Sequence, residues 1–445
     1  MADDVHGPAD AGANTEATVA QLTLAPADHG RFIEVPFEVP PGTEEVAVSC
    51  TVEGVPFAGK LVDLGLRDPE RVRGWSGGAR DRYTVRREWA TPGYLPGLLP
   101  PGRWAVIVAS NRIPPQGCRV AVTVRCTPER LRWLKGDLHM HTVHSDGAYE
   151  PADVVRLAQA AGLDFIATTD HNTVSHNYAF PRDAQIVRIP GLELTTFGGH
   201  ANLLGVAEPV SDFRVSSTAD VRARFAEARQ RGAKIVLNHP FHVCDSPGCH
   251  WDWGWDVDFD WYEVWNGPWR PVNLEALAWW QEQLVRGRRL VAVGGSDTHR
   301  PDPYTGHGKP TTWVWAAAAT APAILDAIGQ GHVFISQLPE GPRINLRCGP
   351  FMMGDEVPAG GAGTGAPALT VSADGLQEGD QVRVLSEQGI EQEWTAGPGE
   401  TALRREWPAP PRRFYRVEVW RYAAAAGQPV MAALSNPIYF ARAGA

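Results

Sequence analysis

The feature that most limits how this chain can fold is an alternation of apolar, strand-like runs with helical segments between residues 131 and 340. The runs include DFIATTDHN, RIPGLELTTF, KIVLNHP and RLVAVGGSDTH. Strands that alternate with helices predict parallel β/α units, in which each helix returns the chain to the start of the next strand. We therefore expect an α/β fold in this region.

Two of the intervening segments carry clear helix signals. Pro151 suits a first helical turn and Gly162 can end that helix, whereas Ser217 or Thr218 can cap a second helix that Gly232 ends. In each segment the apolar residues share one helical face, namely Val154, Leu157, Ala158 and Ala161 in the first and Val221, Phe225 and Ala228 in the second.

The sequences on both sides of this region predict other structures. Residues 1–27 are polar and rich in alanine, and we expect them to be poorly ordered. Residues 28–130 contain short alternating runs separated by Pro/Gly turns, which is typical of a β-sandwich. Residues 341–445 return to strand-like runs and predict a small C-terminal β domain.

Composition narrows the class of protein. The chain has 445 residues, 43% hydrophobic and 21% charged, which is ordinary for a folded protein of two or three domains. Its net charge is −10 and it has no strongly basic run, so a nucleic-acid polymer is a disfavoured partner. The N-terminus does not look like a signal peptide, and no apolar run is long enough to span a bilayer. We therefore expect a cytoplasmic protein without a membrane partner, and the sequence does not predict its oligomeric state.

The six cysteines are scattered along the chain, and in a cytoplasmic protein we expect them to be reduced. Cys244, Cys249 and His250 suggest a zinc knot as one alternative. Because no second cysteine pair completes a tetrahedral site, we favour free thiols in a loop.

Side chains that can bind metal ions occur where the apolar runs end or begin. In a parallel β/α barrel the carboxyl ends of the strands converge on one face, so side chains at these ends should meet. The residues concerned are His139, His141, Asp170, His171, Glu193, His200, His239, Asp297 and His299.

Two of these pairs, His139 with His141 and Asp297 with His299, are separated by one residue and therefore point the same way from a strand. Any one histidine at a strand end is more often a hydrogen-bonded structural residue than a ligand. The whole set, which contains nitrogen and oxygen donors but no thiolate, instead predicts a centre of several metal ions such as Zn, Mn or Fe.

The motifs DLHMHTVHSDG, ATTDHN, GLELTT, GHANLLG, LNHP and GGSDTH, in this order, resemble those of the PHP (polymerase and histidinol phosphatase) superfamily. They are most similar to its branch of metallohydrolases that includes carbaryl hydrolases. The resemblance covers about residues 131–340. It implies a distorted, TIM-like (β/α)7 barrel with a site for three divalent metal ions.

The resemblance also implies which residues hold each metal. The first metal would be held by His139, His141, Glu193 and Asp297. Glu193 would bridge to a second metal, which His200 and His239 complete.

A third metal would be held by Asp146, His171 and His299. Some relatives have a histidine where this chain has Gly147, so this chain departs from part of the family pattern. Asp137 and His144 belong to the same opening motif but are not expected to bind metal directly.

The implied activity is that of a metal-dependent phosphoesterase. A hydroxide held by metals that share Glu193, with Asp297 and His299 beside it, would attack a small organic phosphate mono- or diester. Carbamate or carboxylic ester hydrolysis is the alternative at the same site, because hydroxide attacks either electrophile. A different possibility is a binding protein in which the metals are structural.

Two other hydrolase patterns fit less well. The GWSGG segment at 74–78 lacks the spacing of a serine nucleophile motif and lies in the region that is expected to be all β. Amidohydrolases also begin with HxH but usually add a lysine at a strand end, where this chain has Glu193.

Residues for binding the substrate are harder to identify from the sequence. The stretch 241–270 has six tryptophans, which could stack on an aromatic leaving group or form a packed structural loop. Polar candidates for contacting an ester substrate follow the motif ends and are His242, Arg270, Arg300, His307 and Lys309.

Overall fold

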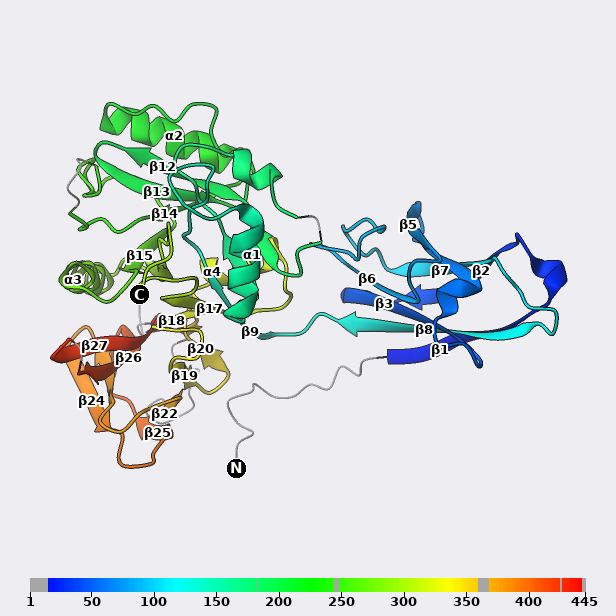
Figure 1. The fold of residues 1–445 in the computed structure, drawn as a ribbon. Coiled ribbons are helices and arrows are strands. Elements are labelled where there is room, and N and C mark those ends of the chain that lie inside the picture. Colours follow the sequence, from blue (N-terminus) through cyan, green and yellow to red (C-terminus); the bar gives the residue numbers. More distant parts are fainter. Residues whose placement is uncertain (1–14, 182, 244–247, 359–367, 425, 442–445) are drawn as a thin grey trace. The chain divides into compact units, whose positions relative to one another are not determined.

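The computed structural model describes residues 15–181, 183–243, 248–358, 368–424 and 426–441. The chain divides into two compact units (Figure 1). Of the described residues, one unit contains those up to Leu131 together with those of Pro181–Val187, and the other contains Arg132–Phe180 and those from Arg188 onward. We call them the N-terminal unit and the metal-site unit.

The N-terminal unit consists of two antiparallel sheets that share one apolar core. Side chains such as Val35 and Val106 from one sheet, and Val46 and Val122 from the other, belong to the same buried cluster. One sheet has the order β1 (Thr15–Leu24), β8 (Cys118–Pro128), β3 (Thr43–Val52) and β6 (Arg82–Arg86), and the other has β2 (Phe32–Val39), β7 (Gly102–Ser110), β4 (Val62–Arg67) and β5 (Val72–Gly77).

Strand β1 corrects one expectation from the sequence. We expected residues 1–27 to be poorly ordered, but residues 15–24 form an edge strand that pairs with β8 along its length. The pairing with β8 satisfies the backbone polar groups of this segment, and Val19, Ala20, Leu22 and Leu24 pack on the apolar core.

All four α-helices of the described residues lie in the metal-site unit, and they are α1 (Pro151–Ala160), α2 (Thr218–Gln230), α3 (Pro271–Val285) and α4 (Ala321–Gly329). The helix signals at α1 and α2 are confirmed. Pro151 begins α1, and the Ser217 side chain accepts a hydrogen bond from the backbone N–H of Asp220 at the start of α2. Gly162 and Gly232 have the positive φ that ends a helix. None of these helices is long and apolar enough to cross a membrane.

The strands that carry the ligand motifs belong to two sheets of this unit. One sheet has the order β11 (Val187–Ile189), β10 (Phe165–Ala167), β9 (Arg132–Asp137), β17 (Thr311–Ala316) and β18 (Val333–Ser336). The other sheet has the order β12 (Gly191–Thr196), β13 (Gly199–Leu204), β14 (Lys234–Leu237), β15 (Trp261–Asn266) and β16 (Val291–Gly295).

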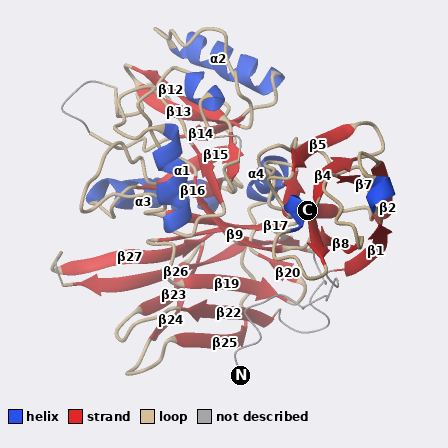
Figure 2. Ribbon diagram, turned by 45° about the vertical axis from the view of Figure 1, so that its right-hand side comes forward, coloured by secondary structure: helices blue, strands red, loops and turns tan. Residues whose placement is uncertain are grey.

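The expectation of uniformly parallel β/α units is wrong for part of this region. Strands β9 and β10 pair in parallel, as do β14, β15 and β16, but β12 and β13 form an antiparallel hairpin with no helix between them. The hairpin turns at Gly199, whose φ of +119° favours glycine, and Thr196 donates a hydrogen bond to its carbonyl at 2.7 Å. Strands therefore outnumber helices in this unit (Figure 2).

Isolated bridges connect the two sheets at their carboxyl ends. Met140, just after β9, bridges Thr298, just after β16, and His171, after β10, bridges Glu193 of β12. Both bridges involve segments with predicted metal ligands. The strand ends therefore converge as the sequence predicted, and a closed (β/α)7 barrel stays a prediction.

The C-terminal strands continue the sheet of β9, β17 and β18, because β18 pairs with β27. Along this sheet follow β27 (Gln428–Ser435), β26 (Phe414–Ala423), β23 (Gln381–Ser386) and β24 (Gly389–Thr395). A second sheet contains β20 (Phe351–Met352), β19 (Arg343–Cys348), β22 (Ala368–Asp374) and β25 (Ala402–Pro408), and β21 (Glu356–Val357) pairs with β28 (Ile438–Phe440).

Helix α2 packs one apolar face onto the strands that carry Glu193 and His200. Val221, Phe225 and Ala228 are buried in the same core cluster as the apolar residues of β12 and β13. We predict that Phe225→Ala lowers the free energy of unfolding of this unit by about 3–5 kcal/mol, because a large side chain that is 2% exposed leaves a cavity. Chemical denaturation followed by tryptophan fluorescence measures the change.

The matched control lies on the same helix, where Ala226 is exposed. Ala226→Ser should change the free energy of unfolding by less than about 0.5 kcal/mol. Equal losses for the two variants would show that Phe225 does not anchor the helix.

Candidate metal centre

The centre of the site is the carboxylate of Glu193, which lies fully buried among histidines at the strand ends. Its Oε1 lies 3.2 Å from His139 Nε2, 3.2 Å from His200 Nδ1 and 3.4 Å from His239 Nε2. Its Oε2 lies 2.8 Å from His171 Nδ1. One carboxylate therefore contacts imidazoles that come from four separate segments of the chain.

Asp297 provides a second carboxylate on the other side of this cluster. Its Oδ1 lies 3.1 Å from His141 Nε2, 3.4 Å from His139 Nε2 and 3.6 Å from His299 Nδ1. Because Glu193 and Asp297 both contact His139 and His141, these four residues form one compact group of donors.

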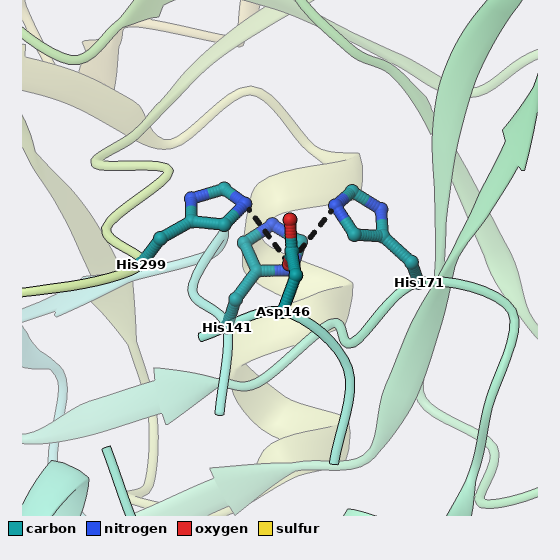
Figure 3. Close-up of side chains that lie close together, drawn as sticks. All are labelled: His141, Asp146, His171 and His299. Carbon is teal, nitrogen blue, oxygen red and sulfur yellow. Dashed lines mark ion pairs between the residues drawn. The ribbon is translucent and has the colours of Figure 1, made fainter. Parts of the chain in front are cut away.

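A more open group of donors lies beside the first (Figure 3). Asp146 Oδ1 is 3.4 Å from His171 Nε2 and 3.4 Å from His299 Nε2, and His141 lies within the same group. The Asp146 side chain is 58% exposed, so this group faces the outside whereas Glu193 does not. All nine predicted ligands are thus brought together.

The donor atoms fit divalent metal ions. Four groups of residues each have ligand atoms that lie within 4.8 Å of one another inside the group. These groups are His139/His141/Glu193, His171/Glu193/His200, His141/Asp146/His171/His299 and His139/His239/Glu263. Several buried nitrogens, among them Nε2 of His139, both ring nitrogens of His141 and Nδ1 of His200, have no hydrogen-bond partner. Buried polar atoms without partners are energetically costly. Bound Zn, Mn or Fe would satisfy these atoms, because these metals prefer nitrogen and oxygen ligands.

The electrostatics of the cluster keep its two central carboxylates ionised. Burial by itself would raise the pKa of Glu193, but the neighbouring His200, His139 and His171 hold that pKa well below its usual range. Burial has the same opposing effect on Asp297, whose pKa is also held well below its usual range by His139 and His141. Burial lowers the pKa of His141 to about 4, so this imidazole is neutral at neutral pH and its unprotonated ring nitrogen can bind a metal.

Strained backbone positions these ligands. His239 and Asp297 have φ values of +23° and +52°, in the left-handed region that residues with a β-carbon rarely adopt. Both lie directly after strands β14 and β16, where the chain turns so that the side chains point into the cluster. Such strain is typically found at functional sites.

Glu263 belongs to the site but was missed by the sequence interpretation. It is buried on β15, its Oε1 lies 2.9 Å from His139 Nδ1, and its Oε2 accepts a hydrogen bond from the backbone N–H of His239 at 3.0 Å. It therefore orients two predicted ligands. Its signal in the sequence is a single carboxylate inside the apolar run WYEVWN, and it was overlooked because it does not stand at the end of the run.

Asp170 ends a strand-like run in the sequence but supports the site rather than joining a donor group. Its carboxylate accepts hydrogen bonds from the Thr142 N–H at 2.8 Å, the Thr142 hydroxyl at 2.7 Å and the Ser145 hydroxyl at 2.5 Å. His176 Nδ1 lies 3.1 Å away. Asp170 thereby anchors the loop that carries Asp146.

Asp137 and His144, which were not expected to be ligands, lie outside the donor groups. Asp137 accepts backbone hydrogen bonds from Ser296 and Gly308 at 3.0 and 2.7 Å, which ties β9 to the segments after β16. His144 Nδ1 lies 2.8 Å from the Ser175 hydroxyl.

A cavity of about 540 Å³ is lined in part by the predicted ligands Asp297 and His299. Two of the predicted substrate residues, Arg270 and Arg300, line it together with Pro268, Asp302, Tyr304 and Thr305. The other candidates lie elsewhere. His242 borders a separate small cavity beside His239, His307 is buried against Tyr149, and Lys309 is exposed and does not line the large cavity.

The tryptophans of residues 241–270 also do not line this cavity. Trp255 stacks on Trp279 of α3 with ring centroids 4.1 Å apart, and Trp251, Trp261 and Trp265 are buried in the core. Among the described residues these tryptophans therefore form a packed structural layer, the second of the two alternatives.

The expectation of free thiols in this loop is wrong for Cys249, which forms a disulfide bond. A cysteine in a disulfide is not a thiolate ligand, so the structure gives no support to a zinc knot at Cys249. Cys244 lies outside the described residues, and Cys50, Cys118, Cys126 and Cys348 are free, as expected.

A comparison with protein families matches a segment that carries several of the donor residues. Residues 137–237 match the PHP domain family. An uncharacterized protein of Methanocaldococcus jannaschii is 24% identical over 148 residues, which cover 30% of this chain and 82% of that protein.

Two solved structures are also similar. One is a two-domain protein from Bacteroides vulgatus that contains a predicted PHP-like metal-dependent phosphoesterase, with 19% identity, a TM-score of 0.39, and coverage of 69% of this chain and 97% of that chain. The other is an amidohydrolase from Chromobacterium violaceum, with 19% identity, a TM-score of 0.29, and coverage of 38% of this chain and 89% of that chain.

Because Glu193 belongs to two of the donor groups, we predict that Glu193→Gln removes more than half of the metal that the purified protein retains after dialysis. Elemental analysis by mass spectrometry measures the content. His332→Ala is the matched control, because His332 pairs with Asp355 at 2.9 Å and belongs to none of the donor groups. Wild-type metal content in Glu193→Gln would refute the assignment of Glu193 as a shared ligand.

We predict that Asp170→Asn weakens metal binding at the Asp146 group by about 10- to 100-fold, because an amide cannot accept all the hydrogen bonds that hold the loop. Titration of the metal-free protein with Zn²⁺ measures the affinity of each site. Asp153→Asn changes a partly exposed aspartate on α1 that belongs to none of the donor groups, and it should have no effect on metal affinity. Identical titrations for wild type and Asp170→Asn would contradict the anchoring role.

Proposed function

We propose that this protein is a metal-dependent phosphoesterase that hydrolyses a small organic phosphate mono- or diester at a centre of three divalent metal ions. The (β/α)7 arrangement, and a place in the branch that includes carbaryl hydrolases, belong to the same proposal. The observation that carries it is Glu193, a buried carboxylate in contact with imidazoles from four segments of the chain. A donor set of this density is expected for several metals rather than one.

The residues divide into an inner and an outer group. His139, His141, Glu193 and Asp297 would hold one metal, and Glu193 would extend to a second with His200 and His239. Asp146, His171 and His299 would hold the third. Divalent ions bound in this way lower the pKa of water towards about 7 and offset negative charge on an ester oxygen.

The protein's own residues set the geometry of the reaction. Asp297 and His299 are ligands that also line the cavity, so a substrate there lies directly against the metal-binding atoms. Among the described residues, the lining of this cavity contains no serine, cysteine or lysine that could act as the nucleophile. We propose direct attack by water, which bound metal ions would activate.

Hydrolysis of a carbamate or carboxylic ester at the same site is the second candidate. The ligands alone do not distinguish these reactions, because each consists of attack by hydroxide on an electrophilic centre. The two arginines that line the cavity favour a negatively charged ester. A third possibility, a binding protein with structural metals, is opposed by the open cavity that reaches the ligands.

The test compares three substrates with the Mn- or Zn-loaded protein, namely p-nitrophenyl phosphate, bis-p-nitrophenyl phosphate and 1-naphthyl methylcarbamate. We predict turnover of at least one phosphate ester. We also expect Asp297→Asn to lower kcat/KM by about 100-fold or more, because a metal contributes several kcal/mol of transition-state stabilisation.

His332→Ala should retain wild-type kcat/KM. Hydrolysis of the carbamate alone would reject the phosphoesterase assignment. Full activity in Asp297→Asn would reject the catalytic role of the centre.

A further inference from the structure

Arg270 lies at the junction of the metal centre and the substrate cavity. It immediately precedes helix α3 and lines the cavity together with the metal ligands Asp297 and His299. The segment that carries it is held in place by Asn273, whose amide donates to the backbone carbonyls of Asn266 at 3.2 Å and Pro268 at 3.0 Å. The position of Arg270 relative to the ligands is therefore well defined.

The guanidinium of Arg270 has no carboxylate partner. No ion pair involves Arg270 in the part of the chain that the structure describes, although four carboxylates surround the neighbouring metal centre. Its Nε is buried and has no hydrogen-bond partner. A buried hydrogen-bond donor without a partner is energetically unfavourable, which indicates that a bound ligand accepts a hydrogen bond from it.

The neutral side chain of Asn266 is what keeps this charge free. Its amide nitrogen lies 3.1 Å from Glu263 Oε2 and 3.3 Å from Asp297 Oδ2, so it donates to both carboxylates. Its amide oxygen is consequently turned towards Arg270, whose Nη2 lies 3.5 Å away. Arg270 is thus tethered by a carbonyl oxygen and not by a negative charge.

The second arginine of the cavity differs in exposure. Arg300 is exposed, and its Nη2 donates to the backbone carbonyl of Asp146 at 3.4 Å. Solvent screens an exposed charge more strongly than a partly buried one. Arg270 should therefore contribute more to anion binding than Arg300, although both carry the same charge.

We propose, on the basis of the function proposed above, that Arg270 is the residue that makes the site select a negatively charged ester over a neutral one. Its free guanidinium binds a non-bridging oxygen of the substrate anion next to the metals. Asn266 is a positioning residue that orients Arg270 without neutralising it.

The first experiment measures binding and does not depend on turnover. Inorganic phosphate is titrated into the metal-loaded wild type, Arg270→Met, Arg270→Lys and Arg300→Met, with metal content measured in each sample. We expect Arg270→Met to weaken phosphate binding by about 10- to 100-fold, the value of a charge-assisted hydrogen bond to a partly buried anion. Arg270→Lys should lose less phosphate affinity than Arg270→Met, because lysine keeps the positive charge although it lacks the planar guanidinium. Arg300→Met should also lose less phosphate affinity than Arg270→Met.

The second experiment measures selectivity as the ratio of kcat/KM for p-nitrophenyl phosphate to kcat/KM for p-nitrophenyl acetate, which share one leaving group. Arg270→Met should lower this ratio by about 10- to 100-fold at unchanged metal content. An unchanged ratio with unchanged phosphate affinity would overturn the inference. So would an Arg300→Met variant that loses as much phosphate affinity as Arg270→Met.

Failure of the underlying phosphoesterase assignment has a different signature. In that case the wild type hydrolyses neither phosphate ester, whereas the phosphate titration still compares Arg270 with Arg300. Phosphate affinity that falls in Arg270→Met then supports Arg270 as an anion-binding residue of a site with another reaction. Phosphate affinity that does not change overturns the inference independently of activity.

Discussion

The segments that carry the candidate ligands are arranged around one desolvated negative charge, the carboxylate of Glu193. Placing an ionised carboxylate at 0% exposure is unfavourable unless positive or hydrogen-bonding groups surround it. Here the compensating groups are imidazoles from separate strand ends together with the Asn238 amide, which donates to Oε1 at 2.7 Å. This requirement explains why segments as distant in the chain as His139 and His239 must meet.

Residues around the cluster hold the candidate ligands in place through hydrogen bonds. Glu263 fixes the ring of His139, and Asp170 fixes the loop that carries Asp146. The left-handed backbone at His239 and Asp297 is energetically unfavourable, and the packing of the surrounding strand ends offsets this strain. A site built in this way is organised before any metal or substrate binds, so little reorganisation is required during the reaction.

The chemistry of the cavity follows from the same constraint. Carboxylates concentrate at the metal centre, and the neutral amide of Asn266 separates them from Arg270. Negative charge on the inner side would hold cations there, while positive charge remains available on the outer side for an anion. The tryptophans of residues 241–270 take no part in this arrangement, because they pack against one another and against α3.

The sequence by itself determined the features that depend on local chemistry. Helices α1 and α2 were predictable because Pro151, Ser217, Gly162 and Gly232 act on backbone within one or two turns. The clustering of the nine predicted ligands could be foreseen because pairs such as His139 and His141 lie on one side of a strand, and because their motifs resemble a known superfamily.

Only the tertiary structure decided the features that depend on partners distant in the chain. The antiparallel hairpin of β12 and β13, the pairing of β18 with β27 and the pairing of β1 with β8 each depend on backbone hydrogen bonds to another strand, which residue patterns do not specify. Glu263 was hidden for the same reason, since a carboxylate inside an apolar run acquires a role only when His139 is folded against it. The free charge of Arg270 likewise exists only because folding places a neutral amide, and no carboxylate, beside it.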